Sequence, residues 1–247
     1  MIRLVEELSM NAWPSLQTML YDGWVLRFAD GYTRRANSIN PIYPSGDDVH
    51  AKIQTCEKLY WDRGLNVVFK ITSAVYPENL DEVLADKGYA VDAQTSVQIL
   101  DLGSMDTSPA QDAALVEALS DEWLAAYCAM SGVPAQREPV LSRILNGIAP
   151  ATCFVSLHHN DKVIACGLGV LQAGFVGLFD IVTDPSFRRQ GYGAQLVRNI
   201  LAWARQRGAH TAYLQVMLNN APALRLYSKL GFNAVYQYWY RVRPFAG

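Results

Sequence analysis

The chain has 247 residues, of which 51% are hydrophobic and 18% charged, and its formal net charge at pH 7 is −2. A chain of this length and composition folds into one large domain or two small ones, and intrinsic disorder is excluded. The small net charge supplies no general field for nucleic acid or an anionic membrane, so neither is expected as a partner.

The N-terminal segment and the cysteines favour a cytoplasmic protein. Residues 1–15 carry acidic groups and no continuous apolar stretch, so no signal peptide is expected. No apolar run approaches the ~20 residues that a membrane span needs. The cysteines are widely spaced and form neither a C-x-x-C pair nor a zinc spacing, which predicts buried, reduced thiols and no metal site: Cys56, Cys128, Cys153 and Cys166.

Hydrophobic periodicity predicts alternating strands and helices in the first part of the chain. Asp30-Gly31 is expected to form a hairpin turn between strands at 24–28 and 36–40. The elements expected after them are a helix at 47–63, a strand at 67–72, a helix at 77–87 and a strand at 95–100.

Residues 101–112 (DLGSMDTSPAQD) are poor in large apolar side chains, which predicts a linker that divides the chain into domains 1–104 and 105–247. Beyond the linker, helices are expected at 113–130, 138–146, 191–207 and 221–230, and strands at 152–158, 162–171, 175–182, 211–217 and 234–242. His158 and His159 precede an expected Asn160-Asp161 hairpin turn, which favours a surface position over metal binding.

The two parts of the chain have the same order of elements and are expected to be distant repeats. Each ends in a strand, a helix, a strand, a helix, a glycine-aromatic pair and a strand. The pair is Gly88-Tyr89 in the first part and Gly231-Phe232 in the second. A chance recurrence of common α/β units is the alternative.

The turn after strand 175–182 has the features of a phosphate site. It runs through Asp184-Pro185 into RRQGYG at 188–193 and then into a helix. Two glycines at a helix start let the backbone approach a ligand, and the free N–H groups and dipole of the first turn attract phosphate. Neither the Walker A pattern nor the dinucleotide G-x-G-x-x-G pattern fits the residues that follow. A purely structural strand–helix turn is the alternative.

These residues resemble the pyrophosphate loop, R/Q-x-x-G-x-G/A, of the GNAT superfamily of acyl-CoA-dependent N-acyltransferases. The superfamily's second motif, N-x-x-A-x-x-L-Y followed by G-F, occurs at the expected distance as NAPALRLY at 220–227 and Gly231-Phe232. The resemblance covers about residues 113–242. A bacterial branch of the superfamily also has a divergent front half with D-G-W and R-R-A-N-S, present here at 22–24 and 34–38.

The resemblance implies an α/β fold, α+β in character, with two GNAT-like halves in tandem and mixed parallel and antiparallel sheets flanked by helices. Because the front half has no R-x-x-G-x-G loop, only the second half is expected to bind acetyl-CoA as a cosubstrate. The cofactor-binding residues implied are Ile181, Val182, Arg188, Arg189, Gln190, Gly191, Tyr192, Gly193, Ala194 and Asn220.

Within that set, the N–H groups of residues 189–194 would hold the pyrophosphate, with charge added by Arg188 and Arg189. The N–H of Ile181 would polarise the thioester carbonyl, and Asn220 would contact the pantetheine arm or a bound water. The family tyrosine that protonates the departing CoA thiolate corresponds to Tyr227. The simpler alternatives are solvated arginines, a helix N-cap at Asn220 and a core tyrosine at Tyr227.

The general base is not given by the motifs. Family members often carry Glu or His on the fourth strand, where this chain has Gly177 and Phe179. In a regular strand, the neighbouring Asp180 points to the face opposite Gly177 and Phe179, unless a local bulge redirects it. A water chain or Glu122 are the other candidates. The segments that flank the acceptor cleft in this fold carry aromatic side chains, most of them expected in the core or at an interface and one or two in the acceptor pocket: Trp123, Tyr127, Tyr236, Tyr238 and Trp239.

The function expected is that of a transferase that moves an acetyl group from acetyl-CoA to the primary amine of a small molecule or peptide, directly and within a ternary complex. The candidate catalytic residues are Tyr227 and Asp180, and no metal is required. A non-catalytic acyl-CoA sensor and a protein-interaction module are the alternatives. The chain is expected to be a monomer with an internal pseudo-dimer, or a homodimer.

Overall fold

The computed structural model describes residues 1–103 and 113–245. The expected boundary between residues 104 and 105 lies outside the described residues and stays a prediction. The chain forms two compact units: unit 1 comprises Met1–Ser96 and Tyr236–Gly247, and unit 2 comprises Val97–Val235. The last part of the chain therefore belongs to the same unit as the first part.

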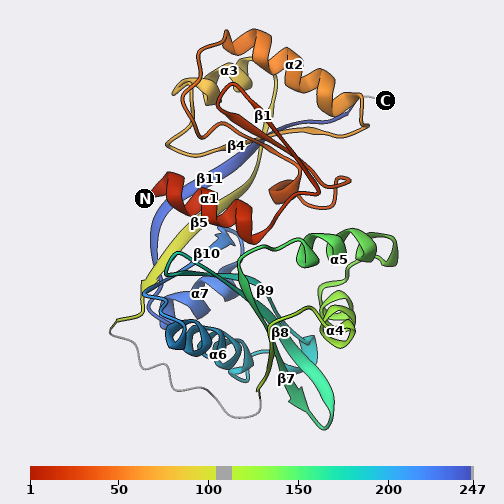
Figure 1. The fold of residues 1–247 in the computed structure, drawn as a ribbon, viewed down its shortest axis with the longest axis vertical. Coiled ribbons are helices and arrows are strands. Elements are labelled where there is room, and N and C mark those ends of the chain that lie inside the picture. The colour runs from red at the N-terminus through yellow and green to blue at the C-terminus, as the bar shows by residue number, and fades with distance from the viewer. Residues whose placement is uncertain (104–112, 246–247) are drawn as a thin grey trace. The chain divides into compact units, whose positions relative to one another are not determined.

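Unit 1 packs two helices against a small mixed sheet, in the strand order β1-β2-β3-β4-β11. Figure 1 shows α2 and α3 beside β4. The elements are α1 (Ile2–Ala12), β1 (Gln17–Tyr21), β2 (Trp24–Phe28), β3 (Ile39–Asn40), α2 (Val49–Trp61), β4 (Val67–Ile71), α3 (Leu80–Asp86) and the first part of β5 (Ala90–Asp101). α2 begins where the Asp48 side chain accepts the N–H of Ala51 at 2.9 Å, as an N-cap residue does.

The loop before β3 differs from the expected strand at 36–40. Residues 34–36 form a 3₁₀ turn, and only Ile39 and Asn40 belong to the strand. The Asn37 side chain accepts the N–H of Ala29 at 2.7 Å and that of Gly31 at 2.9 Å. These bonds hold residues 29–37 as a compact loop, so the predicted strand was too long by three residues.

Unit 2 contains the five strands β10-β9-β8-β7-β6 in that order. Its elements are the second part of β5, β6 (Ala113–Val116), α4 (Asp121–Ser131), α5 (Glu138–Asn146), β7 (Ala151–His159), β8 (Lys162–Gln172), β9 (Phe175–Thr183), α6 (Tyr192–Gln206), β10 (Thr211–Met217), α7 (Ala221–Lys229) and the start of β11 (Asn233–Arg243). The strands from β6 to β9 are antiparallel, and β9 and β10 are parallel. The predicted mixed α/β class is confirmed.

The helix expected at 113–130 is wrong over its first part. Residues 113–116 form β6 and pair with β7, and the helix begins only after Ser120. Ser120 Oγ accepts the N–H of Trp123 at 3.2 Å. This N-cap fixes the start of α4, and the short apolar run before it lies in the sheet because β7 offers an edge for pairing.

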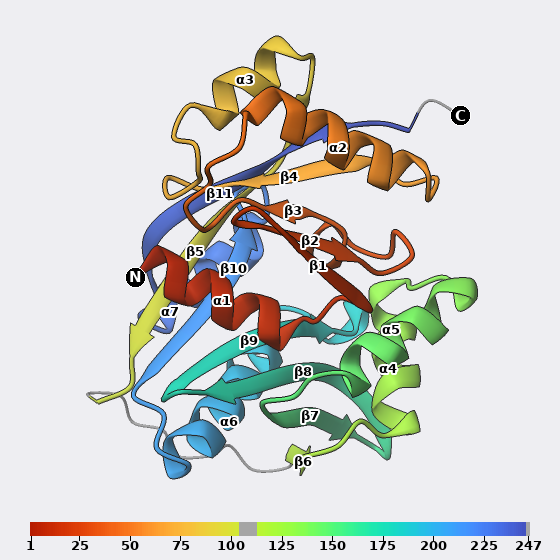
Figure 2. The same ribbon diagram turned by 45° about the horizontal axis from the view of Figure 1, so that its top comes forward.

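The strands β7 to β9 are covered on two faces. On one face, a Cβ at Gly169 would lie 2.4 Å from Ile200 of α6, so glycine permits this close packing. On the other face, Trp123 of α4 packs edge-on against Phe154, with 5.0 Å between ring centroids. Figure 2 shows α6 behind these strands, and α4 and α5 next to them at the right of the view. Among the described residues, no helix is long and apolar enough to cross a membrane.

Candidate active site

The loop between β9 and α6 presents backbone N–H groups at the start of a helix. Arg189 and Gly191 have φ angles of 64° and 92°, and Gly191 is the N-cap residue of α6. This left-handed conformation costs an ordinary side chain about 1–2 kcal/mol and glycine very little. Among the described residues, the N–H groups of 190–194 have no protein acceptor, as expected for a first helical turn. These donors and the helix dipole suit a phosphate group.

Side chains of the same loop donate hydrogen bonds to carbonyl groups of residues that precede it. Arg188 Nε donates to the carbonyl oxygen of Thr183 at 3.2 Å, and Gln190 Nε2 donates to that of Ser186 at 3.2 Å. Both arginines of the loop, Arg188 and Arg189, are exposed to solvent, and their part in binding pyrophosphate stays a prediction.

The pairing of β9 with β10 ends before the two strands end, close to this loop. Their parallel ladder begins with Thr211 opposite Phe175, and its last pair within the described residues is Leu214 opposite Leu178. β9 continues to Thr183 and β10 to Met217. The carboxyl ends of parallel strands are where α/β sheets most often bind ligands.

A β-bulge interrupts β9 at the residues that follow the end of this pairing. Residues 179 and 182 of β9 lie opposite residues 168 and 166 of β8, so Asp180 and Ile181 together face the single residue Gly167. Asp180 has a φ of 53°. The Ile181 side chain lies on the α6 face, 2.8 Å from where a Cβ of Gly167 would be.

The bulge reverses the direction of the Asp180 side chain. A regular strand would place Asp180 on the α6 face, but its Oδ1 accepts a hydrogen bond from the Tyr127 hydroxyl of α4 at 3.1 Å. The β9 strand thus has the local bulge that turns Asp180 away from the face of a regular strand. Asp180 thus lies on the same face as Phe179, where family members often have their base.

No carboxylate can occupy the neighbouring position on that face. A Cβ at Gly177 would lie 2.5 Å from the Phe179 ring and 2.6 Å from the Tyr213 ring. Glu122, the alternative base, lies on the first turn of α4; its side chain is 70% exposed and stands 3.7 Å from His158 Nε2. Asp180 is therefore the more enclosed carboxylate of the two.

The second motif lies on α7, against the cofactor loop. A Cβ at Gly193 would lie 3.3 Å from Leu226, so glycine brings the first turn of α6 close to α7. Asn220 accepts the N–H of Ala223 at 3.2 Å, which makes it the N-cap of α7. Tyr227 is buried in the core of unit 2, and this burial raises the pKa of its phenol to about 12.

Three of the five aromatics in the segments expected to flank the acceptor cleft make contacts within unit 1. The Tyr236 hydroxyl donates to Glu6 at 2.7 Å, Trp239 Nε1 donates to Asp81 at 2.8 Å, and the Tyr238 ring lies 3.9 Å from Lys70 Nζ. In unit 2, Tyr127 contacts Asp180 and Trp123 stacks on Tyr127. The pattern of aromatic residues did not distinguish the two groups.

The cysteines are buried, as predicted, and unsuited to nucleophilic catalysis. Burial raises the pKa of Cys153 and of Cys166 to about 12, so both are thiols at neutral pH. Among the described residues, no cluster of His, Cys, Asp or Glu could hold a metal ion.

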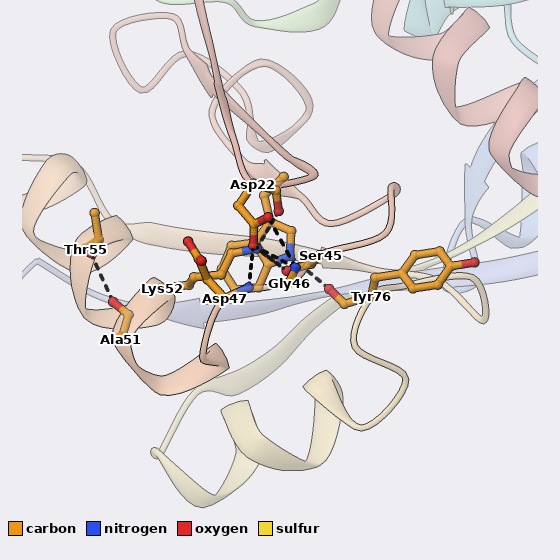
Figure 3. A network of polar contacts seen from close by, with 9 residues as sticks. Asp22, Ser45, Gly46, Asp47, Ala51, Lys52, Thr55 and Tyr76 are labelled. Atoms are coloured by element: carbon orange, nitrogen blue, oxygen red, sulfur yellow. Dashed lines mark hydrogen bonds and ion pairs between the residues drawn. The ribbon is translucent and has the colours of Figure 1, made fainter.

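The corresponding loop of unit 1 is filled by the chain's own carboxylate. β3 and β4 are parallel strands with α2 between them in sequence, as β9 and β10 are with α6. Figure 3 shows Asp22 among donors from the loop before α2 and from α2 itself: the N–H of Asp47 at 2.9 Å and that of Gly46 at 3.1 Å in the loop, and Lys52 Nζ of α2 at 2.9 Å. The Asp47 N–H and Lys52 hold the pKa of Asp22 well below its usual value. This arrangement agrees with the expectation of a cofactor site in the second half alone.

Comparisons with known proteins agree with the fold and identify the family. The family model "Probable histone acetyltransferase Rv0428c C-terminal" matches residues 1–241. The uncharacterized N-acetyltransferase YobR of Bacillus subtilis is 30% identical over 247 residues, 98% of each chain.

Solved structures show the same fold at low identity. A GCN5-related N-acetyltransferase from Kribbella flavida has a TM-score of 0.70 at 17% identity, over 98% of this chain and 95% of that one. A tandem GNAT protein from the clavulanic acid biosynthesis pathway has a TM-score of 0.63 at 12% identity, over 96% and 87%. Matched nearly from end to end, the chain belongs to the Rv0428c C-terminal family within the GNAT superfamily of N-acetyltransferases.

Proposed function

We propose that the protein transfers an acetyl group from acetyl-CoA to a primary amine, directly and in a ternary complex within unit 2. One observation carries the proposal: the bulge in β9 turns Asp180 onto the α4 face immediately before the strand runs into the phosphate-binding loop. A proton acceptor and an anion site thus lie at the two ends of one short segment of chain.

In this mechanism the loop binds and orients the cosubstrate. The N–H groups of residues 189–194, with Arg188 and Arg189, hold the pyrophosphate by charge-assisted hydrogen bonds. Val182 lies along the pantetheine, and Asn220 contacts it or a bound water. The N–H of Ile181 donates to the thioester carbonyl and stabilises the negative charge that develops on its oxygen.

Two side chains move the protons. A primary amine with a pKa near 10.4 is almost wholly protonated at neutral pH and must lose a proton before it attacks. Asp180 accepts that proton and passes it to solvent, and the amine nitrogen then bonds to the carbonyl carbon. The tetrahedral intermediate gives its second N–H proton to Asp180 as the carbon–sulfur bond breaks. Tyr227 donates its phenolic proton to the departing thiolate and regains one from solvent. The products are the acetylated amine and CoA thiol, with one proton released.

The acceptor classes compatible with this chemistry are protein lysines, protein N-termini and small amines. The description of the matching family names a probable histone acetyltransferase, which places lysine peptides first among the candidates to test.

The experiment measures CoA thiol release from acetyl-CoA with a lysine peptide, a peptide with a free α-amine and a polyamine, each beside its N-acetylated form. We expect release with at least one free amine and none with its blocked counterpart, and at least about 10²-fold less with Asp180→Asn. A folded protein that binds acetyl-CoA without releasing thiol to any amine would instead be a sensor.

A further inference from the structure

The hydrogen bond between Tyr127 and Asp180 joins two residues that neither sequence motif contains. The Tyr127 hydroxyl on α4 donates to Asp180 Oδ1 at 3.1 Å, across the 53 positions that separate them in the chain. Asp180 has a positive φ on the bulge of β9, a conformation that is uncommon for aspartate and persists only where the surroundings hold it.

Tyr127 is itself held by a rigid neighbour. Its ring stacks on that of Trp123, with 5.2 Å between centroids and 8° between planes. Trp123 is 2% exposed, and its Nε1 donates to the carbonyl oxygen of Val155 on β7 at 3.1 Å. A continuous set of contacts therefore runs from β7 through Trp123 and Tyr127 to the Asp180 carboxylate.

The other titratable groups near Asp180 are two buried thiols and the glutamates that share their surroundings. Cys128 of α4 lies within the electrostatic reach of Asp180 and Glu138, and Cys166 of β8 within that of Asp180 and Glu122. Burial raises the pKa of both thiols, so neither places a negative charge beside Asp180 at neutral pH. The Tyr213 ring of β10 packs edge-on against the ring of Phe179, the neighbour of Asp180 in the chain. His158 lies next to Glu122.

We infer that Tyr127 is a positioning residue that fixes the orientation and the charged form of the Asp180 carboxylate for proton transfer. The inference rests on the proposed function. A hydroxyl that donates to a carboxylate stabilises its ionised form. Removal of the hydroxyl therefore raises the pKa of Asp180, and the active, deprotonated base appears only at higher pH.

The test compares the pH profile of kcat/KM for the amine in the wild type and in Tyr127→Phe. One lost hydrogen bond of about 1–1.5 kcal/mol moves the acidic limb up by about one pH unit. The rate below that limb is then about tenfold lower, and the KM for acetyl-CoA is unchanged. The matched control is Tyr43→Phe, which removes a hydroxyl bonded to Glu7 in unit 1 and should leave the profile where it was.

Two further variants separate the possible failures. Asp180→Asn should abolish the acidic limb and most of the rate, and Tyr127→Phe/Asp180→Asn should be no slower than Asp180→Asn alone. An unmoved acidic limb in Tyr127→Phe, with Asp180→Asn inactive, would overturn the inference and leave the proposed function standing. Wild-type rate and profile in Asp180→Asn would remove the base role of Asp180, and the inference with it.

Discussion

Tyr227 shows how burial can suit a residue to act as an acid. It packs edge-on against Phe232, with 5.8 Å between ring centroids, in the core of unit 2. Burial raises the pKa of its phenol to about 12, because an apolar surrounding disfavours the phenolate. The phenol therefore keeps its proton over the whole range in which an enzyme of this kind works.

Replacement of Tyr227 by phenylalanine tests this role. We predict a fall in kcat of about 10²-fold or more, with the KM for acetyl-CoA nearly unchanged, because only the proton donor is lost. In the wild type, ionisation of a group with a pKa of about 12 should cause no loss of rate below about pH 10. Steady-state kinetics from pH 6 to about 10 measure the kcat and KM of the variant and the pH dependence of the wild-type rate. An unchanged kcat in the variant would make Tyr227 a core residue only.

Gly177 marks the place where a base on β9 is sterically excluded. We predict that Gly177→Ala destabilises the protein by about 1–3 kcal/mol, since its Cβ would lie 2.5 Å from the Phe179 ring. For a protein of this size that lowers Tm by roughly 2–10 °C, measured by thermal unfolding. Gly46→Ala is the control, since a Cβ at Gly46 meets nothing within 4 Å. Equal Tm values for the two variants would contradict the packing argument.

At the scale of elements, the two strand–helix loops both present backbone N–H donors, but these donors have different surroundings. Among the described residues, the N–H groups of the loop before α6 have no protein acceptor, whereas the loop before α2 donates to Asp22. The Asp22 backbone, with a φ of 37°, belongs to the turn between β1 and β2, so the carboxylate also ties this hairpin to α2. Lys52 completes the arrangement from within α2, with its side chain fully buried.

The Asp22 arrangement predicts a pH-dependent stability. Because the pKa of Asp22 is well below its usual value in the folded protein, its contribution is present above about pH 4 and is lost as the pH falls through the folded pKa. We predict that Asp22→Asn lowers Tm clearly at pH 7 and that the difference from the wild type shrinks at lower pH. Thermal unfolding of both proteins between pH 3 and pH 7 checks this. A difference that is independent of pH would contradict it.

Most elements were predictable because their own residues determine them. α5 and β10 have the bounds that periodicity predicts, and the Asn160-Asp161 turn has the positive φ angles of a tight hairpin. β1 was missed because its side chains are largely exposed and show no alternation. The direction of Asp180 was not decidable, because a bulge depends on how β9 pairs with β8 and not on its own residues.

At the scale of the whole molecule, the chain does not divide into two successive halves. β11 begins in unit 2 and ends in unit 1, where Trp239 to Arg243 pair with β4. The tandem resemblance in sequence predicts two halves, but it does not predict that β11 passes from unit 2 into unit 1. A terminal strand can pair in either unit without a change in its hydrophobic pattern. Truncation before β11 is therefore expected to remove a strand from unit 1 as well as from unit 2.

The central claim is one acetyl-CoA site at the loop before α6, and calorimetric titration tests it most directly. We predict one acetyl-CoA per chain in the wild type and binding weaker by about 10²-fold or more in Arg188→Glu/Arg189→Glu, because charge-assisted phosphate contacts are lost. Arg3→Glu/Arg198→Glu changes the net charge equally at exposed positions elsewhere and should bind as the wild type does. Two sites per chain, or no binding by the folded wild type, would contradict the account.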